Sequence, residues 1–228
     1  DGTRLVTASW DKTAKLWGVA SGELITSFAH QDGVRWAAFS PDGARILTAS
    51  TDKTAKLWDM ALGKLIASFA HQDGVSAAAF SPDGARILTG SADKTAKLWD
   101  VNSGKLVASF THEDAVRRVA FSPDGSRILT GSADNTAKLW DAASGKLIAS
   151  FDHQASVYHA AFSPDGARIL TASADNTVKL WDAASGELIA SFDHQDLVYD
   201  AAFSPDGTRI LTASADQSAK LWDTPSGK

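Results

Sequence analysis

Histidine, serine and aspartate, the three groups of acyl-transfer catalysis, recur together along this chain. His30, His71, His112, His153 and His194 are spaced 41 residues apart, and each is followed at fixed distances by a serine and an aspartate. A catalytic triad of these residue types is normally a single constellation in a protein, whereas this set occurs five times. We therefore expect the set to be structural, and the sequence predicts no catalytic residue.

The same spacing governs the rest of the sequence. Trp17 begins a series of tryptophans that ends at Trp222, and a Ser-Pro-Asp-Gly run opens at Ser40 and at each later equivalent position. A fixed period between about 20 and 50 residues is typical of one supersecondary unit that stacks on copies of itself. The elements that hold the histidines must therefore be found within one repeat.

One repeat, residues 71–111, contains four short apolar runs separated by turn residues. The runs are Val75–Phe80, Arg86–Ser91, Ala96–Trp99 and Lys105–Phe110. Proline, glycine, aspartate and asparagine stand at the joins, and none of the runs is long enough for an ordinary helix. The pattern predicts a four-stranded antiparallel meander, with sheets covered on both faces by their neighbours.

Within this pattern, Ser-x-Asp-x-Thr followed by Lys-Leu-Trp-Asp, with a histidine ahead of the first strand, resembles the WD40-repeat β-propeller family, in particular its highly similar bacterial repeats. The resemblance covers nearly the whole chain and implies an all-β fold with one four-stranded blade per repeat around a central channel. The chain departs from the family where Ala, Thr or Asp precedes the histidine in place of glycine.

The resemblance implies a single partial propeller over residues 1–228, with four complete blades and two partial ones. The expected blades are 1–29 (second to fourth strands), 30–70, 71–111, 112–152, 153–193 and 194–228 (first to third strands). Such a ring would not close by itself. Either the chain is a fragment of a longer array, or a second copy supplies the missing strands as a homo-oligomer.

The family also implies a hydrogen-bonded tetrad of histidine, serine, aspartate and tryptophan in each complete repeat. The implied sets are His30, Ser50, Asp52, Trp58; His71, Ser91, Asp93, Trp99; His112, Ser132, Asp134, Trp140; His153, Ser173, Asp175, Trp181; and His194, Ser214, Asp216, Trp222. We expect histidine to link aspartate to serine, and the tryptophan N–H to find a partner.

The repeats differ mainly at the third, fifth and sixth residues after each histidine and at the residue before the turn aspartate; we call these positions the variable columns. Arginine and aromatic side chains, which are favoured at binding hot spots, are concentrated there. The family implies that this end of the blades, the top face, binds partners. The candidate partner-binding residues are Trp10, Arg35, Trp36, Arg117, Arg118, Tyr158, His159, Tyr199 and Asp200.

Simpler explanations of these positions stay open. Neutral drift would also vary exposed residues, although the equally exposed last strand of each repeat has hardly changed. Trp36 would then fill space beside a neighbouring blade, and His159 would be a packed core residue.

The sequence therefore predicts a non-catalytic scaffold that binds a protein or peptide partner, as a module of a larger signalling or sensor protein. One alternative is recognition of a small ligand or a modified peptide, with Tyr158, Tyr199 and Trp36 as an aromatic cage and the arginines binding an anion. A propeller-framed enzyme is the third reading, and His159 with Asp200 is the unique titratable pair it could use.

Charge and composition limit the classes of partner and cofactor that the sequence predicts. The net charge of −5 gives no indication of nucleic-acid binding, and no apolar run approaches a membrane span. The absence of cysteine favours a reducing, cytoplasmic location. No phosphate-binding or dinucleotide motif and no metal-ligand spacing occurs, so the sequence predicts no cofactor and no metal.

Overall fold

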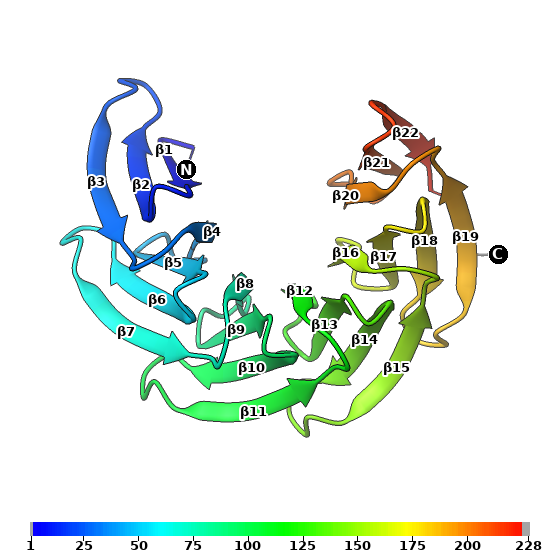
Figure 1. Cartoon of the computed structure of the whole chain (residues 1–228), viewed down its shortest axis with the longest axis horizontal. Coiled ribbons are helices and arrows are strands. Elements are labelled where there is room, and N and C mark those ends of the chain that lie inside the picture. The colour runs from blue at the N-terminus through cyan, green and yellow to red at the C-terminus, as the bar shows by residue number, and fades with distance from the viewer. Residues whose placement is uncertain (1, 225–228) are drawn as a thin grey trace. The chain divides into compact units, whose positions relative to one another are not determined.

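The computed structural model of the chain describes residues 2–224 (Figure 1). The chain divides into two compact units, Asp1–Phe110 (unit 1) and Thr111–Lys228 (unit 2). The outer limits expected for the first and last repeats, residues 1 and 225–228, lie outside the described residues. That both units belong to one propeller domain stays a prediction.

The described part of unit 1 holds three antiparallel sheets, one of three strands and two of four. The sheets are β1 (Arg4–Ala8), β2 (Thr13–Gly18) and β3 (Leu24–Ala29); β4 (Val34–Phe39), β5 (Arg45–Ser50), β6 (Thr54–Asp59) and β7 (Leu65–Ala70); and β8 (Val75–Phe80), β9 (Arg86–Ser91), β10 (Thr95–Asp100) and β11 (Leu106–Thr111).

Unit 2, as far as it is described, also holds three sheets, two of four strands and one of three. They are β12 (Val116–Phe121), β13 (Arg127–Ser132), β14 (Thr136–Asp141) and β15 (Leu147–Asp152); β16 (Val157–Phe162), β17 (Arg168–Ser173), β18 (Thr177–Asp182) and β19 (Leu188–Asp193); and β20 (Val198–Phe203), β21 (Arg209–Ser214) and β22 (Ala219–Asp223).

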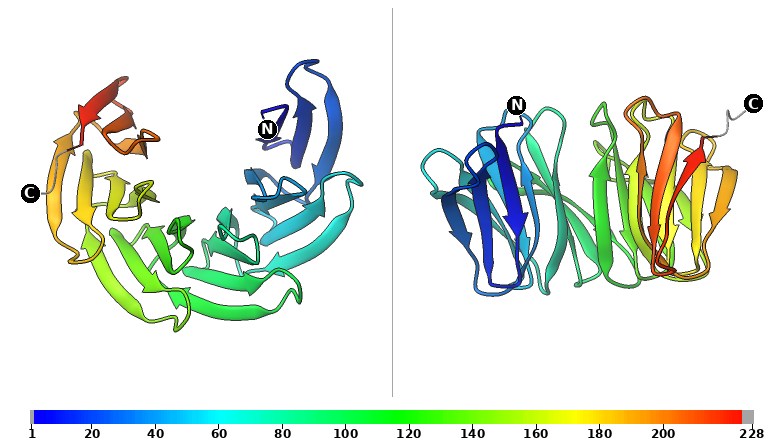
Figure 2. Two further views of the ribbon diagram at one scale, coloured as in Figure 1. Left: turned by 180° about the vertical axis from the view of Figure 1, so that it is seen from behind. Right: turned by 90° about the horizontal axis from the view of Figure 1, so that it is seen from above.

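Each sheet is an up-and-down meander in which sequence neighbours pair, and the alternating strand directions can be followed in Figure 2. Residues 2–224 contain no helix, so no helix there could cross a membrane. The predicted all-β fold of short antiparallel meanders is confirmed; closure into a ring stays a prediction.

A sheet that packs between two others, such as β4–β7 in unit 1, is buried on both faces, which explains the nearly continuous apolar runs. On β5, Ile46 packs with Leu16 and Phe28 of the preceding sheet. Its neighbour Leu47 points to the opposite face and packs with Val75 and other residues of the following sheet. Both β5 side chains are fully buried, and each such burial contributes about 1.5–3 kcal/mol.

The turn between the second and third strands of each four-stranded sheet requires a left-handed residue. Lys94 has φ of 70°, and Asn135 has φ of 71° at the equivalent position. A left-handed conformation costs most L-residues about 1–2 kcal/mol, and asparagine tolerates it better than lysine. The repeats with lysine at this turn are therefore strained relative to those with asparagine.

We expect Lys94→Asn to raise the free energy of unfolding by about 0.5–1 kcal/mol, because it relieves part of this backbone cost. The measurement is the urea midpoint of the variant against the parent chain. Lys64→Asn is the control, since Lys64 has no positive φ. Equal midpoints for Lys94→Asn and Lys64→Asn would show that the turn is not strained.

Candidate functional site

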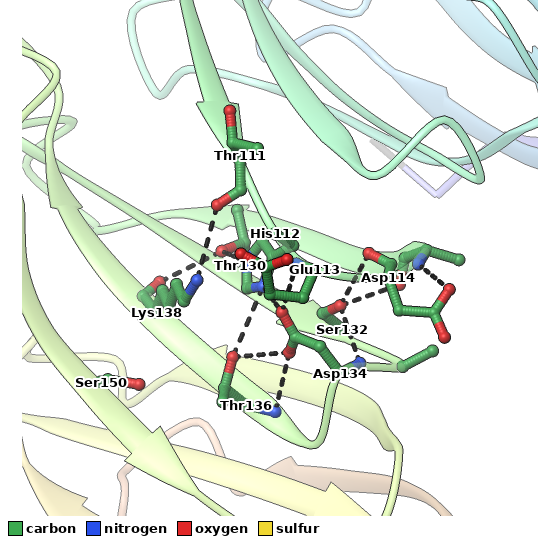
Figure 3. Close-up of polar contacts among 12 residues, drawn as sticks. Thr111, His112, Glu113, Asp114, Thr130, Ser132, Asp134, Thr136, Lys138 and Ser150 are labelled. Carbon is green, nitrogen blue, oxygen red and sulfur yellow. Dashed lines mark hydrogen bonds and ion pairs between the residues drawn. The ribbon is translucent and has the colours of Figure 1, made fainter.

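A hydrogen-bonded network occupies the start of the β12–β15 sheet (Figure 3). His112 Nδ1 lies 2.7 Å from Asp134 Oδ2, and His112 Nε2 lies 2.7 Å from Thr130 Oγ1. Trp140 Nε1 donates to the same Thr130 hydroxyl at 2.9 Å. Equivalent networks join His30, Thr48, Asp52 and Trp58; His71, Thr89, Asp93 and Trp99; His153, Thr171, Asp175 and Trp181; and His194, Thr212, Asp216 and Trp222.

The chemistry of the donors fixes the proton positions in this network. An ionised aspartate only accepts, so His112 donates from Nδ1. Its Nε2 then accepts from Thr130, whose oxygen accepts from Trp140. Burial raises the pKa of Asp134, but hydrogen bonds from Thr136, the Glu113 N–H and His112 outweigh it and hold that pKa at about 2.

The serine predicted for each tetrad is wrong, because a threonine two residues earlier occupies its place. Ser132 Oγ instead donates to the Asp114 carbonyl at 3.0 Å and accepts from the Asp134 N–H. In the pairing of β13 with β14, Trp140 lies opposite Ile128. Side chains two residues apart on a strand share a face, so Thr130 is the next side chain after Ile128 on the Trp140 face, and Ser132 is one further away. The same correction applies to Ser50, Ser91, Ser173 and Ser214, whose places are taken by Thr48, Thr89, Thr171 and Thr212.

The histidine also joins neighbouring sheets within a unit. The His71 N–H donates to the carbonyl of Lys53, in the β4–β7 sheet, at 2.9 Å. Its side chain binds Asp93 and Thr89 of the β8–β11 sheet. Lys97 Nζ donates back to the Ala70 carbonyl at 3.1 Å. The network therefore braces one sheet against the next.

Three of these buried histidines, His30, His71 and His112, make stability depend on pH. Burial lowers the pKa of His30, His71 and His112 from 6.5, and it outweighs the raising effect of each aspartate partner. The unfolded chain then binds more protons below about pH 6.5. Stability is full above that pH and falls as the pH drops toward the folded pKa values.

We expect the free energy of unfolding to decrease between pH 7 and pH 5, by at most about 1.4 kcal/mol per pH unit for each histidine. Urea unfolding at a series of pH values measures the slope, and His112→Gln should make it shallower. The expectation fails if stability is flat or rises on acidification across this range.

The fifth residue after each histidine, one of the variable columns, lies at a β-bulge. On β12, Val116 pairs with Ser132 and Arg118 pairs with Gly131, which leaves Arg117 as the extra residue. The same shift occurs at Arg35, Ser76, Tyr158 and Tyr199. A bulge redirects a side chain out of the regular alternation. One of the variable columns is therefore also the position that the bulge releases from the regular strand pairing.

In unit 2 the bulged residues contact one another. The Arg117 guanidinium lies 5.0 Å from the ring centre of Tyr158, and the Tyr158 and Tyr199 rings are 6.0 Å apart. Tyr199 is 57% exposed. Arg117 Nε is buried and has no hydrogen-bond partner among the described residues. The three side chains form one contiguous ladder with an exposed aromatic end.

The sixth-column residues of unit 2 form a second ladder beside it. His159 is buried, and its Nδ1 is hydrogen-bonded to Asp200 Oδ1. Burial lowers the pKa of His159 despite this contact. Arg118 lies in the field of Asp200, and its own pKa is lowered chiefly by burial. His159 is therefore a packed residue bonded to Asp200, as the simpler explanation of this position expects, whereas the Asp200 side chain is exposed.

Unit 1 carries its own cluster of candidate residues. Trp10 is 69% exposed, and the Arg35 guanidinium lies 5.6 Å from its ring centre. The Trp10 ring lies directly against Gly33, where a Cβ would clash with it. Trp36 is half-buried and packs against the hydrophobic core that includes Leu57. Trp10 and Arg35 can therefore contact a partner, while Trp36 serves mainly as packing.

Two features of the site have no distinguishing signal in the sequence. The bridging threonine is identical in all five repeats, but so is the serine two positions later, so identity does not choose between them. The bulge leaves no residue signature in this chain. In residues 2–224, no group of three histidine or acidic side chains could hold a metal ion.

The repeats also match a known family of sequence repeats. The family model described as WD domain, G-beta repeat matches six segments, 1–18, 22–59, 63–100, 104–141, 145–182 and 186–223. No curated protein matches the chain.

Proposed function

This chain belongs to the WD40-repeat family, whose repeats generally mediate protein–protein interactions, and from that premise we propose that it is a non-catalytic scaffold. A partner protein or peptide binds side chains of the variable columns. In unit 2 these are the exposed Tyr199 and Asp200 with the half-buried Arg117 and Tyr158, and in unit 1 they are the exposed Trp10 and Arg35. The chain acts as a module of a larger signalling or sensor protein.

The separation of repeated from variable residues carries this proposal. The repeated histidine, threonine, aspartate and tryptophan residues are hydrogen-bonded to one another. The fifth-column residues instead lie on bulges, and Trp10, Tyr199 and Asp200 of the variable columns are exposed. Arginine, tyrosine and tryptophan are the side chains most often found at binding hot spots. Stability and recognition thus reside in different residues of the same strands.

The state of the five network histidines supports a structural role for them. The five network histidine side chains are 0% exposed, and both ring nitrogens of each are already hydrogen-bonded. A general base must reach the proton that it removes. These rings cannot reach a substrate without dismantling the network.

We also propose that the sheets are blades of a β-propeller, completed by further repeats or by a second chain. Leu211 and Leu221 of the β20–β22 sheet are 52% and 61% exposed, whereas the equivalent Leu47 and Leu57 are fully buried. Another sheet packed on this face would cover both leucines. Native mass measurement tests the second-chain version, which predicts an oligomer.

The binding site is tested with the variant Arg117→Ala/Tyr158→Ala/Tyr199→Ala. Peptides are first selected on the parent chain from a displayed random library. We expect the triple variant to bind them more than about 100-fold more weakly, because hot-spot side chains each carry a large share of the affinity. Its thermal unfolding midpoint should change by only a few degrees.

A matched control replaces exposed residues away from the variable columns, namely Glu187, Leu188 and Ser191, by alanine. This control should keep full peptide affinity. The proposal is wrong if the triple variant retains binding, or if the β19 control loses it equally.

A phosphorylated peptide is a second candidate ligand, favoured by the buried Arg117 Nε that lacks a hydrogen-bond acceptor. Phosphate oxygens suit guanidinium donors in geometry and charge. Titration of matched phosphorylated and unmodified peptides separates this candidate from a plain protein partner. A preference for the phosphorylated form that disappears in Arg117→Ala supports it.

A further inference from the structure

The outer edge of β15 is unpaired. The sheet order is β12-β13-β14-β15, so β15 has a strand neighbour on one side only within the described chain. Leu147 and Ile148 at its start are 51% and 48% exposed. Ile148 is the extra residue of a bulge, because Leu139 pairs with Ala149 and Trp140 pairs with Leu147. An edge strand of this kind offers free backbone groups and apolar side chains to another strand.

The charges at the two ends of β15 distinguish it from the other outer strands. Lys146 precedes the strand and Asp152 ends it, and both are exposed. In the part of the chain that the structure describes, neither forms an ion pair. The corresponding pairs at the other edges are Glu23 and Ala29, Lys64 and Ala70, Lys105 and Thr111, and Glu187 and Asp193. Opposite charges therefore occur at the two ends of β15 alone among these five strands.

We propose that β15 pairs antiparallel with β15 of a second copy of this chain. Antiparallel pairing centred on Ala149 places Lys146 of each copy opposite Asp152 of the other. Ile148 then lies opposite Ser150 of the second copy. Opposite charges directly across a strand pair are favourable, and like charges are unfavourable. The same patch meets itself, as a twofold dimer requires.

The other outer edges lack this self-complementarity. Self-pairing of β19 would bring Glu187 against Asp193, two like charges. Self-pairing of β7 would leave Lys64 opposite Ala70, with no charge partner. Both strands carry the same bulge as β15, so apolar exposure alone does not single out β15.

Sedimentation of the full chain over a range of concentrations tests the pairing. We expect a reversible dimer that Lys146→Glu weakens by about ten- to thirty-fold, because two attractive pairs become repulsive. The charge-swapped variant Lys146→Glu/Asp152→Lys should restore it. Lys64→Glu, the matched change beside β7, should have no effect. Dissociation at every concentration, or equal association of Lys146→Glu, would overturn the proposal.

Cross-linking separates this dimer from completion of a propeller. The chain has no cysteine, so a single introduced thiol reports one location. Ser150→Cys lies close to the twofold axis and should give a covalent dimer with a short bismaleimide reagent. Ser68→Cys, its equivalent on β7, should not. Equal cross-linking at both positions would show unspecific edge association, and cross-linking at neither would place the dimer contact elsewhere.

Discussion

Replacing Thr130 by valine is expected to lower the free energy of unfolding by about 2–4 kcal/mol. Valine keeps the shape of the side chain but removes the hydroxyl that lies between His112 and Trp140. The indole N–H and the imidazole Nε2 would then both be buried without partners, at about 1–3 kcal/mol each. Urea unfolding of the variant measures the change.

Ser132→Ala is the matched control for this prediction. It removes the hydroxyl that the family resemblance assigned to the tetrad, but Ser132 bonds only to backbone groups. We expect it to cost about 1 kcal/mol. If Ser132→Ala destabilised the chain more than Thr130→Val, the threonine-centred network would be the wrong description.

Replacing Trp181 by alanine is expected to have the largest effect of any single change considered, about 3–5 kcal/mol. The Trp181 ring lies 5.2 Å from the ring of Phe151 and 6.3 Å from that of His153. Its N–H donates to Thr171 at 2.8 Å. Alanine would leave a cavity between two sheets of unit 2 and would remove the indole donor to the Thr171 oxygen, whose hydroxyl would remain bonded to His153 Nε2.

Trp17 offers a control at the equivalent position of another repeat, where the run reads Ala-Lys-Leu-Trp in place of Val-Lys-Leu-Trp. Its N–H donates to Thr7, but its network has no histidine and its ring is only half-buried. We expect Trp17→Ala to cost about 1–2 kcal/mol, because less surface is lost from a packed core. Comparable losses for Trp17→Ala and Trp181→Ala would mean that the histidine network adds little to the packing.

Strands and turns could be predicted from the sequence because local chemistry determines them. Each run is bounded by proline, glycine or aspartate, and the period of 41 residues fixes the register of one repeat on the next. The identity of the bridging hydroxyl depends on strand pairing, which places Trp140 opposite Ile128. Serine and threonine have the same hydroxyl, and only this pairing decides which one the indole reaches.

The candidate site was located by variation between repeats, and the structure adds the contacts. Arg117 and Tyr158 are 41 residues apart in the sequence yet lie in contact, because β12 and β16, the first strands of neighbouring sheets in unit 2, lie side by side. That contact depends on the bulge at each strand start and on the packing of one sheet against the next. A list of variable residues contains neither. The sequence could group Tyr158 with Tyr199 and His159 with Asp200 as candidates, but it could not predict the contact of Arg117 with Tyr158.

Amide hydrogen exchange of the chain, with and without a selected peptide, tests the central claim most directly. We expect bound peptide to slow exchange at the starts of β12, β16 and β20, around residues 116–118, 157–159 and 198–200. We expect no change at the repeated Ser-Pro-Asp-Gly turns. Protection confined to those turns, with none at the variable columns, would contradict the account.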